Sequence, residues 1–366
     1  MKREAYVCAL LNEIKARATK EYLVDTIYFG GGTPSLLSVE QIGRILSTVR
    51  ENFVLCDDAE ITLECNPSAR GRGTSKAPSP TDARDVEDAI PYGAYDYFSG
   101  LKRLGVNRLS LGVQSAVDTE LKLIGRQHSF EEAKRTFFDA READFENISL
   151  DLMLGIPSQN MDSLERSVKE LVNLAPEHIS IYSLQLEEGT PLYKMRDRYS
   201  IADDDMAADM YELVVRLMKS AGYKHYEISN FAREGKESRH NSKYWRLDEY
   251  LGLGLASHSD FQETRSENTR DMSAYLEGKY YLSGQEIGVK EREVEFIMLG
   301  LRMSEGISKT EFFCRFGVDF DEKYGEKLKK LEKAGYVYLN GDRVALNERG
   351  FELSNMILAD ILDFDY

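Results

Sequence analysis

The hydrophobic positions of this chain follow two alternating periods up to about residue 230. Segments with apolar residues three and four positions apart predict amphipathic helices, and short apolar runs between them predict buried strands. The first helix is expected over 4–20, and the capping box of Ser38 and Gln41 marks the start of the second. The expected strands are 25–29, 60–67, 108–114, 148–154, 178–184 and 223–228.

Six strands that alternate with helices predict a parallel sheet, and right-handed crossovers curl such a sheet. We therefore predict an α/β fold with a partial (β/α) barrel of the TIM type. Such a barrel opens with a strand, whereas this chain opens with a helix. One strand of the regular pattern is therefore expected to be missing, which would leave strand 25–29 at an exposed edge of the sheet.

Two segments depart from the alternating pattern. Residues 68–97 combine turn-forming and basic residues without an apolar period, which predicts a mobile surface insertion. Residues 286–366 predict a second domain after a barrel domain over 1–285. There, helices and a strand pair around an Asn-Gly-Asp turn indicate a winged-helix-like arrangement.

The charge balance argues against nucleic acid as a partner. The 366 residues carry a net charge of −16, and from Gly288 onward 12 Lys and Arg face 16 Asp and Glu. No apolar run approaches the roughly 20 residues that cross a bilayer, and the start Met1–Glu4 does not resemble a signal peptide. A cytoplasmic protein without a transmembrane segment is expected, and a peripheral membrane contact stays open.

The cysteines offer no local metal site. Cys8, Cys56, Cys65 and Cys314 are scattered, and no two of them lie within four residues of each other. This spacing excludes a local zinc or iron–sulfur ligand run. We expect four buried, reduced thiols.

Candidate chemistry gathers at the carboxyl ends of the expected strands, which is where ligands bind in parallel α/β sheets. The first strand ends in a triple glycine, whose sharp turn is expected to leave amide groups free for a ligand. Every later strand up to the fifth also ends in a polar side chain. The candidates in order are Gly31, Gly32 and Thr33, then Glu64, Gln114, Asp151 and Gln185.

Three charged residues of this region need a partner or a ligand. Asp151 and Glu64 follow apolar residues, where a carboxylate requires a hydrogen-bonding group such as a ligand hydroxyl. Arg126, after Gly125, could hold a carboxylate in a bidentate fork, or could be a solvated arginine at a helix end.

Two later stretches also allow two interpretations. Residues 238–245 place the only tryptophan beside a histidine, which suits a flat conjugated ligand with His240 as an axial iron ligand. The alternative is a packing corner. In residues 250–259, spaced glycines indicate either a close approach to a ligand or close packing of the backbone.

Together these motifs resemble the radical S-adenosylmethionine (SAM) proteins related to oxygen-independent coproporphyrinogen III oxidase. His240-Asn241 and Tyr244-Trp245 match the HNxxYW signature of the HemW branch, regarded as heme chaperones. The remaining motifs cover nearly the whole chain outside 68–97. They are Tyr28–Ser35, Glu64–Pro67, Ser110–Ser115, Gly125-Arg126, Asp151 with Gly155–Pro157, and Glu188–Pro191.

The resemblance implies a partial barrel that holds SAM against a [4Fe–4S] cluster, which reduces SAM to a radical. Gly31, Gly32 and Thr33 would contact the amino-acid moiety of SAM. Four side chains would contact the other polar groups of SAM. Four further residues are candidates for heme binding. The SAM side chains are Glu64, Gln114, Arg126 and Asp151, and the heme candidates are His240, Asn241, Tyr244 and Trp245.

The sequence departs from the family ahead of its first helix. The family carries a three-cysteine motif on the loop after the first barrel strand, but here only Met1–Glu4 precede the opening helix. We expect a truncated sequence rather than a lost cluster. The printed chain is therefore expected to make no radicals, and it offers neither a catalytic residue nor a metal ligand.

Three functions remain open from the sequence. The first is a heme chaperone that uses SAM and a cluster when complete and passes heme to an unidentified protein. The second is an oxygen-independent coproporphyrinogen III oxidase of porphyrin biosynthesis, which decarboxylates two propionates. The third is a winged-helix regulator, which the acidic C-terminal domain disfavours. The HNxxYW signature favours the chaperone.

Overall fold

The computed structural model describes residues 2–67, 94–186, 188–189, 191–194 and 198–363. Residues 68–93 of the expected insertion therefore lie outside the described residues. Residues 94–97 do not belong to a mobile loop, because they form the first turn of helix α3 (Ala94–Arg103). Ala94 and Tyr97 are buried there, which anchors this turn in the core.

The chain divides into two compact units. The first unit comprises Met1–Arg17, Tyr226–Ile228 and Ser238–Tyr366, and the second comprises Ala18–His225 and Ser229–Glu237. The second unit contains nearly all of a seven-stranded sheet with the order β1-β2-β3-β4-β5-β7-β6. Its first five strands are parallel neighbours in sequence order, as the alternating pattern predicts. They are β1 (Leu23–Phe29), β2 (Val54–Cys65), β3 (Arg108–Gln114), β4 (Ile148–Leu154) and β5 (His178–Ser183).

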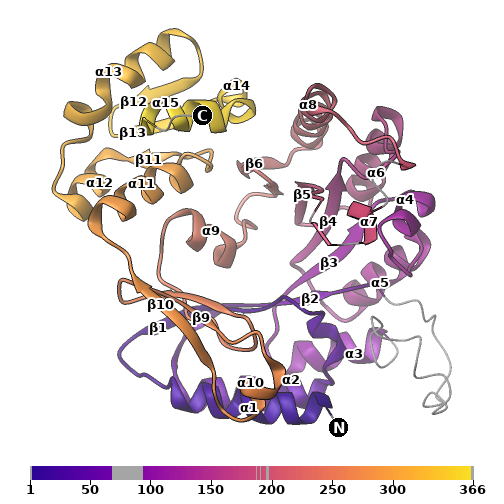
Figure 1. Cartoon of the computed structure of the whole chain (residues 1–366). Helices are drawn as coiled ribbons and strands as arrows, with labels where there is room; N and C mark the ends of the chain where they lie inside the picture. The colour runs from indigo at the N-terminus through magenta and orange to yellow at the C-terminus, as the bar shows by residue number, and fades with distance from the viewer. Residues whose placement is uncertain (1, 68–93, 187, 190, 195–197, 364–366) are drawn as a thin grey trace. The chain divides into compact units, whose positions relative to one another are not determined.

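The expected place of the sixth strand, next to the fifth, is wrong. Residues 223–228 contain only the short strand β6 (Lys224–Glu227), and the neighbour of β5 is β7 (Asn230–Ala232), which runs antiparallel to it. Only Ile228 and Ser229 separate β6 from β7. A parallel crossover needs a dozen or more residues, so the chain turns back here. The strand order is open at both ends, and the sheet forms an incomplete barrel (Figure 1).

Strand β1 lies at the first position in the strand order, so the expected edge position of the triple-glycine strand is confirmed. The expectation that it is buried is wrong, because none of its seven residues is buried and Leu23 is 63% exposed. An edge strand has a neighbouring strand on one side only. The apolar composition of β1 therefore does not by itself place this strand in the core.

The two faces of the sheet differ in chemistry. One face, here called the helix face, packs apolar side chains such as Leu63, Leu111 and Leu152 against the helices. The opposite pocket face carries polar side chains at the alternating positions, among them Arg108, Ser149 and His178, all buried. The helices that pack on the helix face, drawn beside the sheet in Figure 1, are α2 (Val39–Asn52), α3, α5 (Phe130–Glu142), α6 (Met161–Asn173) and α8 (Asp204–Ser220).

The other unit begins with α1 (Lys2–Ala16), which is held by a buried carboxylate. Glu13 is 0% exposed and accepts hydrogen bonds from Tyr275 Oη at 2.7 Å, Asn268 Nδ2 at 2.6 Å and Gly254 N at 2.8 Å. These partners come from a region where the sequence analysis predicted no sheet. The region contains β8 (His258–Phe261), β9 (Thr264–Asn268), α10 (Met272–Leu276) and β10 (Tyr281–Glu286), and the three strands form one antiparallel sheet.

The C-terminal part of this unit has its own core. A sheet with the order β11-β13-β12 packs with five helices, and β12 and β13 are the strand pair that the winged-helix pattern predicts. None of the described helices has both the length and the apolar composition to cross a bilayer. The elements are α11 (Val289–Gly300), β11 (Ile307–Ser308), α12 (Lys309–Phe316), α13 (Phe320–Lys333), β12 (Val337–Asn340), β13 (Arg343–Leu346), α14 (Glu348–Glu352) and α15 (Ser354–Leu362).

Candidate functional site

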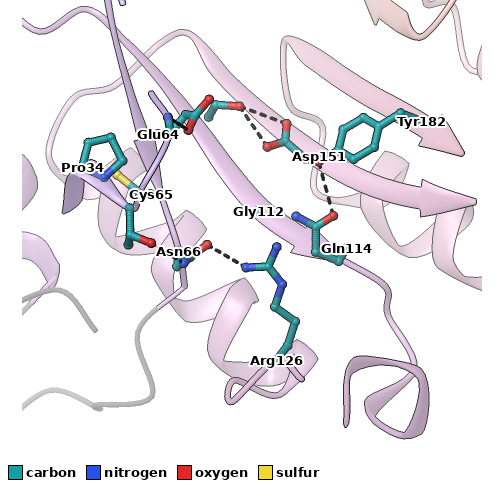
Figure 2. Close-up of a pocket in the computed structure, with 12 residues that line it drawn as sticks. Pro34, Glu64, Cys65, Asn66, Gly112, Gln114, Arg126, Asp151 and Tyr182 are labelled. Atoms are coloured by element: carbon teal, nitrogen blue, oxygen red, sulfur yellow. Dashed lines mark hydrogen bonds between the residues drawn. The ribbon is translucent and has the colours of Figure 1, made fainter. Parts of the chain in front are cut away.

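A polar cavity of about 260 Å³ opens at the carboxyl ends of the parallel strands (Figure 2). All five parallel strands or the loops after them contribute to it, which is where a parallel α/β sheet binds ligands. The side chains in Figure 2 come from elements far apart in the sequence and point into one space. The lining residues are Gly31, Thr33, Pro34, Glu64, Cys65, Asn66, Ser110, Gly112, Gln114, Arg126, Asp151 and Tyr182.

The triple-glycine turn forms one wall, but its amides are less free than the sequence suggested. Gly31 N donates to Glu64 Oε2 at 3.1 Å, and Thr33 N donates to Gly31 O at 2.9 Å. Gly31 has φ of +90° and Thr33 has φ of 57°, so the turn uses the left-handed region twice. The expectation of open amides is therefore wrong for Gly31 and Thr33, because Glu64 of β2 accepts from the first and the turn itself accepts from the second.

Glu64 connects this turn to the sheet through hydrogen bonds. Its Oε1 accepts a hydrogen bond from Tyr28 Oη at 2.7 Å. Burial raises the pKa of Glu64, although the bonds from Tyr28 and Gly31 favour its ionised form. A Cβ at Gly30 would lie 2.7 Å from the Tyr28 ring and 3.1 Å from Glu64 Oε1, so this glycine makes room for the pair.

Asp151 lies on the pocket face at the centre of β4. Its carboxylate accepts hydrogen bonds from Ser110 Oγ at 2.9 and 3.1 Å and from Ser149 Oγ at 3.3 Å. Burial raises the pKa of Asp151 to about 6, and the charge of Glu64 adds to this. The serine hydroxyls and the charge of Arg108 act in the opposite direction. Asp151 is therefore held ready to accept a hydrogen bond from a ligand.

Gln114 reaches the cavity because β3 is irregular at its end. The register between β3 and β4 shifts between Leu111 and Gln114, and Gln114 itself has φ of 69°. Such irregularities re-aim side chains next to functional sites. Its Oε1 accepts a hydrogen bond from Tyr182 Oη at 3.4 Å. A Cβ at Gly112 would lie 3.0 Å from Gln114 Nε2, so the absent side chain keeps this part of the cavity open.

Arg126 extends into the cavity from the loop after α4 (Asp118–Leu123). Its Nη1 donates to Asn66 Oδ1 at 2.9 Å, and the side chain is only partly buried. Arg126 is therefore not an arginine that contacts only solvent at a helix end, which was the alternative. No carboxylate is bonded to it among the interactions of the described residues, so further guanidinium donors remain for a ligand.

The cavity brings together most of the side chains that the sequence selected as SAM contacts. Gly32 belongs to the turn but does not line the cavity, and Gln185 is exposed outside it. The expectation for Gln185 is wrong because β5 ends at Ser183, and Tyr182 supplies the polar group instead. Tyr182 could have been predicted, because side chains two residues apart share one face of a strand. It follows His178 and Ser180 of the pocket face at this spacing. Asn66, also missed, stands inside the motif Glu64–Pro67.

The four heme candidates lie together on one short helix of the other unit, α9 (Arg239–Trp245). His240 Nε2 lies 2.9 Å from Tyr244 Oη, and Tyr244 is 40% exposed. Asn241 is partly exposed, and the Trp245 ring lies 6.0 Å from the guanidinium of Arg302. Ser238 caps the start of the helix, and its Oγ accepts from Asn241 N at 3.2 Å.

The glycine-spaced stretch 250–259 is a place of close packing. A Cβ at Gly252 would lie 1.9 Å from His258 O, and one at Gly254 would lie 2.8 Å from Tyr6 Oη. The glycines are therefore explained by neighbouring protein atoms. This observation favours the packing alternative for the stretch.

The cysteines do not gather. Cys65 is buried, but Cys8 and Cys314 are exposed and Cys56 is partly exposed, so the expectation of four buried thiols is wrong. Cys8 and Cys314 lie on the solvent sides of their helices. Within the part of the chain that the structure describes, no three His, Cys, Asp or Glu side chains are placed to hold a metal ion.

Comparison with known proteins identifies close relatives across nearly the whole length. The radical SAM superfamily model matches residues 9–171, and the HemN C-terminal domain model matches residues 289–353. The heme chaperone HemW of Bacillus subtilis is 34% identical over 92% of this chain and 85% of its own length. HemW of Escherichia coli is 32% identical over 96% of this chain and 88% of its own length.

Among solved structures, coproporphyrinogen III oxidase (HemN) from Escherichia coli has a TM-score of 0.78 and 22% sequence identity. The match covers 99% of this chain and 84% of that chain. At this identity the likeness concerns the fold.

Proposed function

The chain belongs to the HemW family of radical SAM proteins, and we propose that it is a heme chaperone that binds heme and transfers it to an acceptor protein. The observation that carries the proposal is the sequence identity of 34% to HemW of Bacillus subtilis over 92% of the chain. The HNxxYW residues, which lie together on α9, agree with it.

We propose that the cavity at the strand ends binds SAM. This ligand carries two cationic groups, a sulfonium and an ammonium, besides one carboxylate and the hydroxyls of a ribose. The cavity offers a matching set: the carboxylates of Glu64 and Asp151, the guanidinium of Arg126 and two amide side chains, Asn66 and Gln114. Opposite charges that are arranged in this way fix the orientation of a zwitterionic ligand.

Each group has a distinct role in this proposal. Arg126 holds the carboxylate of SAM in a charge-assisted pair, while Asn66 keeps the guanidinium in place. Glu64 attracts the ammonium next to the triple-glycine turn. Asp151 accepts hydrogen bonds from hydroxyls, with Ser110 fixing the orientation of its carboxylate. Tyr182 adds an aromatic wall.

Membership of the radical SAM superfamily implies a [4Fe–4S] cluster, which supplies the electron that cleaves SAM. The described residues hold no set of ligands that fits a cluster. We therefore assign no step through a cluster to these residues. Their part is to bind SAM, to orient it and to exclude water from it.

SAM binding is tested by equilibrium dialysis of the full chain against labelled SAM. We expect Arg126→Met to weaken binding about 30-fold to 160-fold, because a charge-assisted pair contributes roughly 2–3 kcal/mol. Arg135→Met, at an exposed arginine of α5, is the matched control and is expected to leave the affinity unchanged. Equal affinities of the two variants would refute the assignment of the cavity.

Chaperone function is tested by loading the full chain with hemin and mixing it with apomyoglobin. We expect the absorption spectrum to change to that of holomyoglobin faster than with free hemin at the same concentration, because chaperoned hemin does not self-associate. The alternative, an oxygen-independent coproporphyrinogen III oxidase, rests on the likeness of fold to HemN. Release of carbon dioxide from coproporphyrinogen III by the SAM-loaded and cluster-loaded protein would favour that enzyme instead.

A further inference from the structure

Tyr28 of β1 contacts a residue of the cavity wall, although Tyr28 does not line the cavity itself. Its neighbours Ile27 and Phe29 pack against the apolar core of the helix face. Because side chains alternate along a strand, the side chain of Tyr28 points to the pocket face. Its Oη donates a hydrogen bond to Glu64 Oε1 at 2.7 Å. Tyr28 therefore acts on a ligand in the cavity through the carboxylate of Glu64.

The carboxylate of Glu64 is held at both oxygens. Oε1 accepts from the phenol group of Tyr28, and Oε2 accepts from Gly31 N at 3.1 Å. Each carboxylate oxygen has two lone pairs, so each keeps one acceptor position for a ligand. The terminal torsion of a glutamate side chain is otherwise broad. Donors at both oxygens therefore fix the plane of this carboxylate and the direction of its remaining lone pairs.

The phenol group of Tyr28 stays protonated and donates this bond at neutral and acidic pH. Burial raises the pKa of Tyr28, and the negative charge of Glu64 raises it further. The bond in turn favours the ionised form of Glu64, against the burial that raises the pKa of this carboxyl group. The other titratable or charged groups around Glu64 are Cys65 on β2, Asp151 on β4, Tyr182 on β5 and Arg126 in the loop after α4.

We propose that Tyr28 is a positioning residue for SAM, whose phenol group fixes the carboxylate of Glu64 where the ammonium group of SAM binds. This role rests on the proposed binding of SAM in the cavity. An ammonium group is a compact charge with three donors, so it pairs best with lone pairs that are directed at it. Loss of the Tyr28 hydroxyl leaves the Gly31 amide to hold Glu64. The attraction for the ammonium group then weakens, whereas the nucleoside end of the ligand keeps its contacts.

The test compares the wild-type full chain with Tyr28→Phe in equilibrium dialysis against three ligands. SAM has an ammonium and a carboxylate, decarboxylated SAM has only the ammonium, and methylthioadenosine has neither. We expect Tyr28→Phe to weaken the binding of the first two ligands about tenfold, because a hydrogen bond to a charged group is lost. Its affinity for methylthioadenosine should change less than about twofold. Arg126→Met should weaken the binding of SAM but not that of decarboxylated SAM.

The matched control is Tyr324→Phe, which loses the same type of hydrogen bond in the other unit. Tyr324 Oη donates to Glu293 Oε1 at 2.6 Å, and the variant should bind SAM as the wild type does.

The pH dependence supplies a second readout. Loss of the bond raises the pKa of Glu64, so Tyr28→Phe loses the charge of this carboxylate at a higher pH than the wild type does. The ratio of wild-type to variant affinity for SAM should therefore grow as the pH falls from about 8 to about 5. The titration of Asp151 is common to both proteins and divides out of this ratio.

Three results would overturn the role of Tyr28. They are wild-type affinity for SAM in Tyr28→Phe, an equal loss of affinity for all three ligands, and an affinity ratio that stays constant or shrinks on acidification. If Arg126→Met still weakens the binding of SAM in these experiments, the cavity assignment stands without Tyr28. If the wild-type chain binds no SAM, the proposed function of the cavity fails as well, so the two failures are distinguishable.

Discussion

Asp151 is a side chain whose ionisation decides what the cavity can bind. It is surrounded by Ser110, Ser149, Glu64 and Arg108, and burial raises its pKa to about 6. Its ionised form accepts hydrogen bonds at both oxygens, whereas its protonated form has lost the charge and turns one oxygen into an O–H donor. The protein thus keeps a carboxylate close to its titration point inside the cavity.

The affinity for SAM should therefore fall as the pH falls through this pKa of about 6. Below it, each pH unit should cost about tenfold in affinity, because one proton must leave before the ligand binds. Asp151→Asn should bind more weakly and without this pH dependence. Equilibrium dialysis between about pH 5 and pH 8 measures the profile.

A second variant tests the electrostatic cause. Arg108 is 1% exposed, and its charge favours the ionised form of Asp151. Replacing it with an uncharged residue removes that effect, so Arg108→Met should move the midpoint of the profile to higher pH. A midpoint that stays in place or moves to lower pH would contradict this assignment.

Gly112 provides a steric test of the same cavity. A Cβ at this position would lie 3.0 Å from Gln114 Nε2 and 3.3 Å from Asn66 Oδ1. Gly112→Val should therefore abolish measurable SAM binding. Gly325→Val, in α13 of the other unit, removes a glycine elsewhere and should retain binding. Wild-type affinity in the Gly112 variant would show that the ligand lies elsewhere.

At the scale of residues, the sequence predicted which side chains line the cavity but not how these side chains are bonded to one another. Glu64, Gln114, Arg126 and Asp151 could be selected because polar groups follow apolar runs at strand ends, and all four line the cavity. The bulge that turns Gln114 inward and the hydrogen bond from the Gly31 amide to Glu64 depend on contacts between strands. Such contacts have no local signature in the sequence.

At the scale of elements, Glu13 shows how a single carboxylate can hold a helix in place. It accepts three hydrogen bonds that join α1 to the β8–β10 region. Glu13→Ala leaves buried donors without partners, so it should reduce the free energy of unfolding by roughly 3 kcal/mol. Calorimetric unfolding of the full chain measures the change.

The control for this prediction lies two residues further along α1. Lys15→Ala changes an exposed side chain and should alter the stability by less than about 0.5 kcal/mol. If both variants unfold at the wild-type temperature, the buried carboxylate does not secure the helix.

Elements with a strong apolar period could be predicted, and elements without one could not. The five parallel strands and the helices between them were found because their helix faces are apolar. The sheet of β8, β9 and β10 was missed because these strands are short and polar, and every residue of β10 is exposed. Strand β7 was missed because it has only three residues and follows β6 after only two residues.

At the scale of the whole molecule, the net charge of −16 affects how an anionic ligand approaches. Hemin carries two propionates, so long-range repulsion should slow its association with the chain at low salt. Raising the ionic strength from about 10 mM to about 150 mM should increase the association rate several-fold, because screening shortens the range of this repulsion. Stopped-flow absorption measures the rate, with the dimethyl ester of hemin as a control that should respond less.

The central claim is that this chain is a heme-binding member of the HemW family, and a hemin titration of the full chain tests it most directly. We predict a Soret band that shifts from its position in free hemin and saturates at one hemin per chain. The double variant His240→Ala and Tyr244→Phe should lose the saturable shift. A linear, unsaturable spectrum that is the same for the wild type and the double variant would contradict the claim.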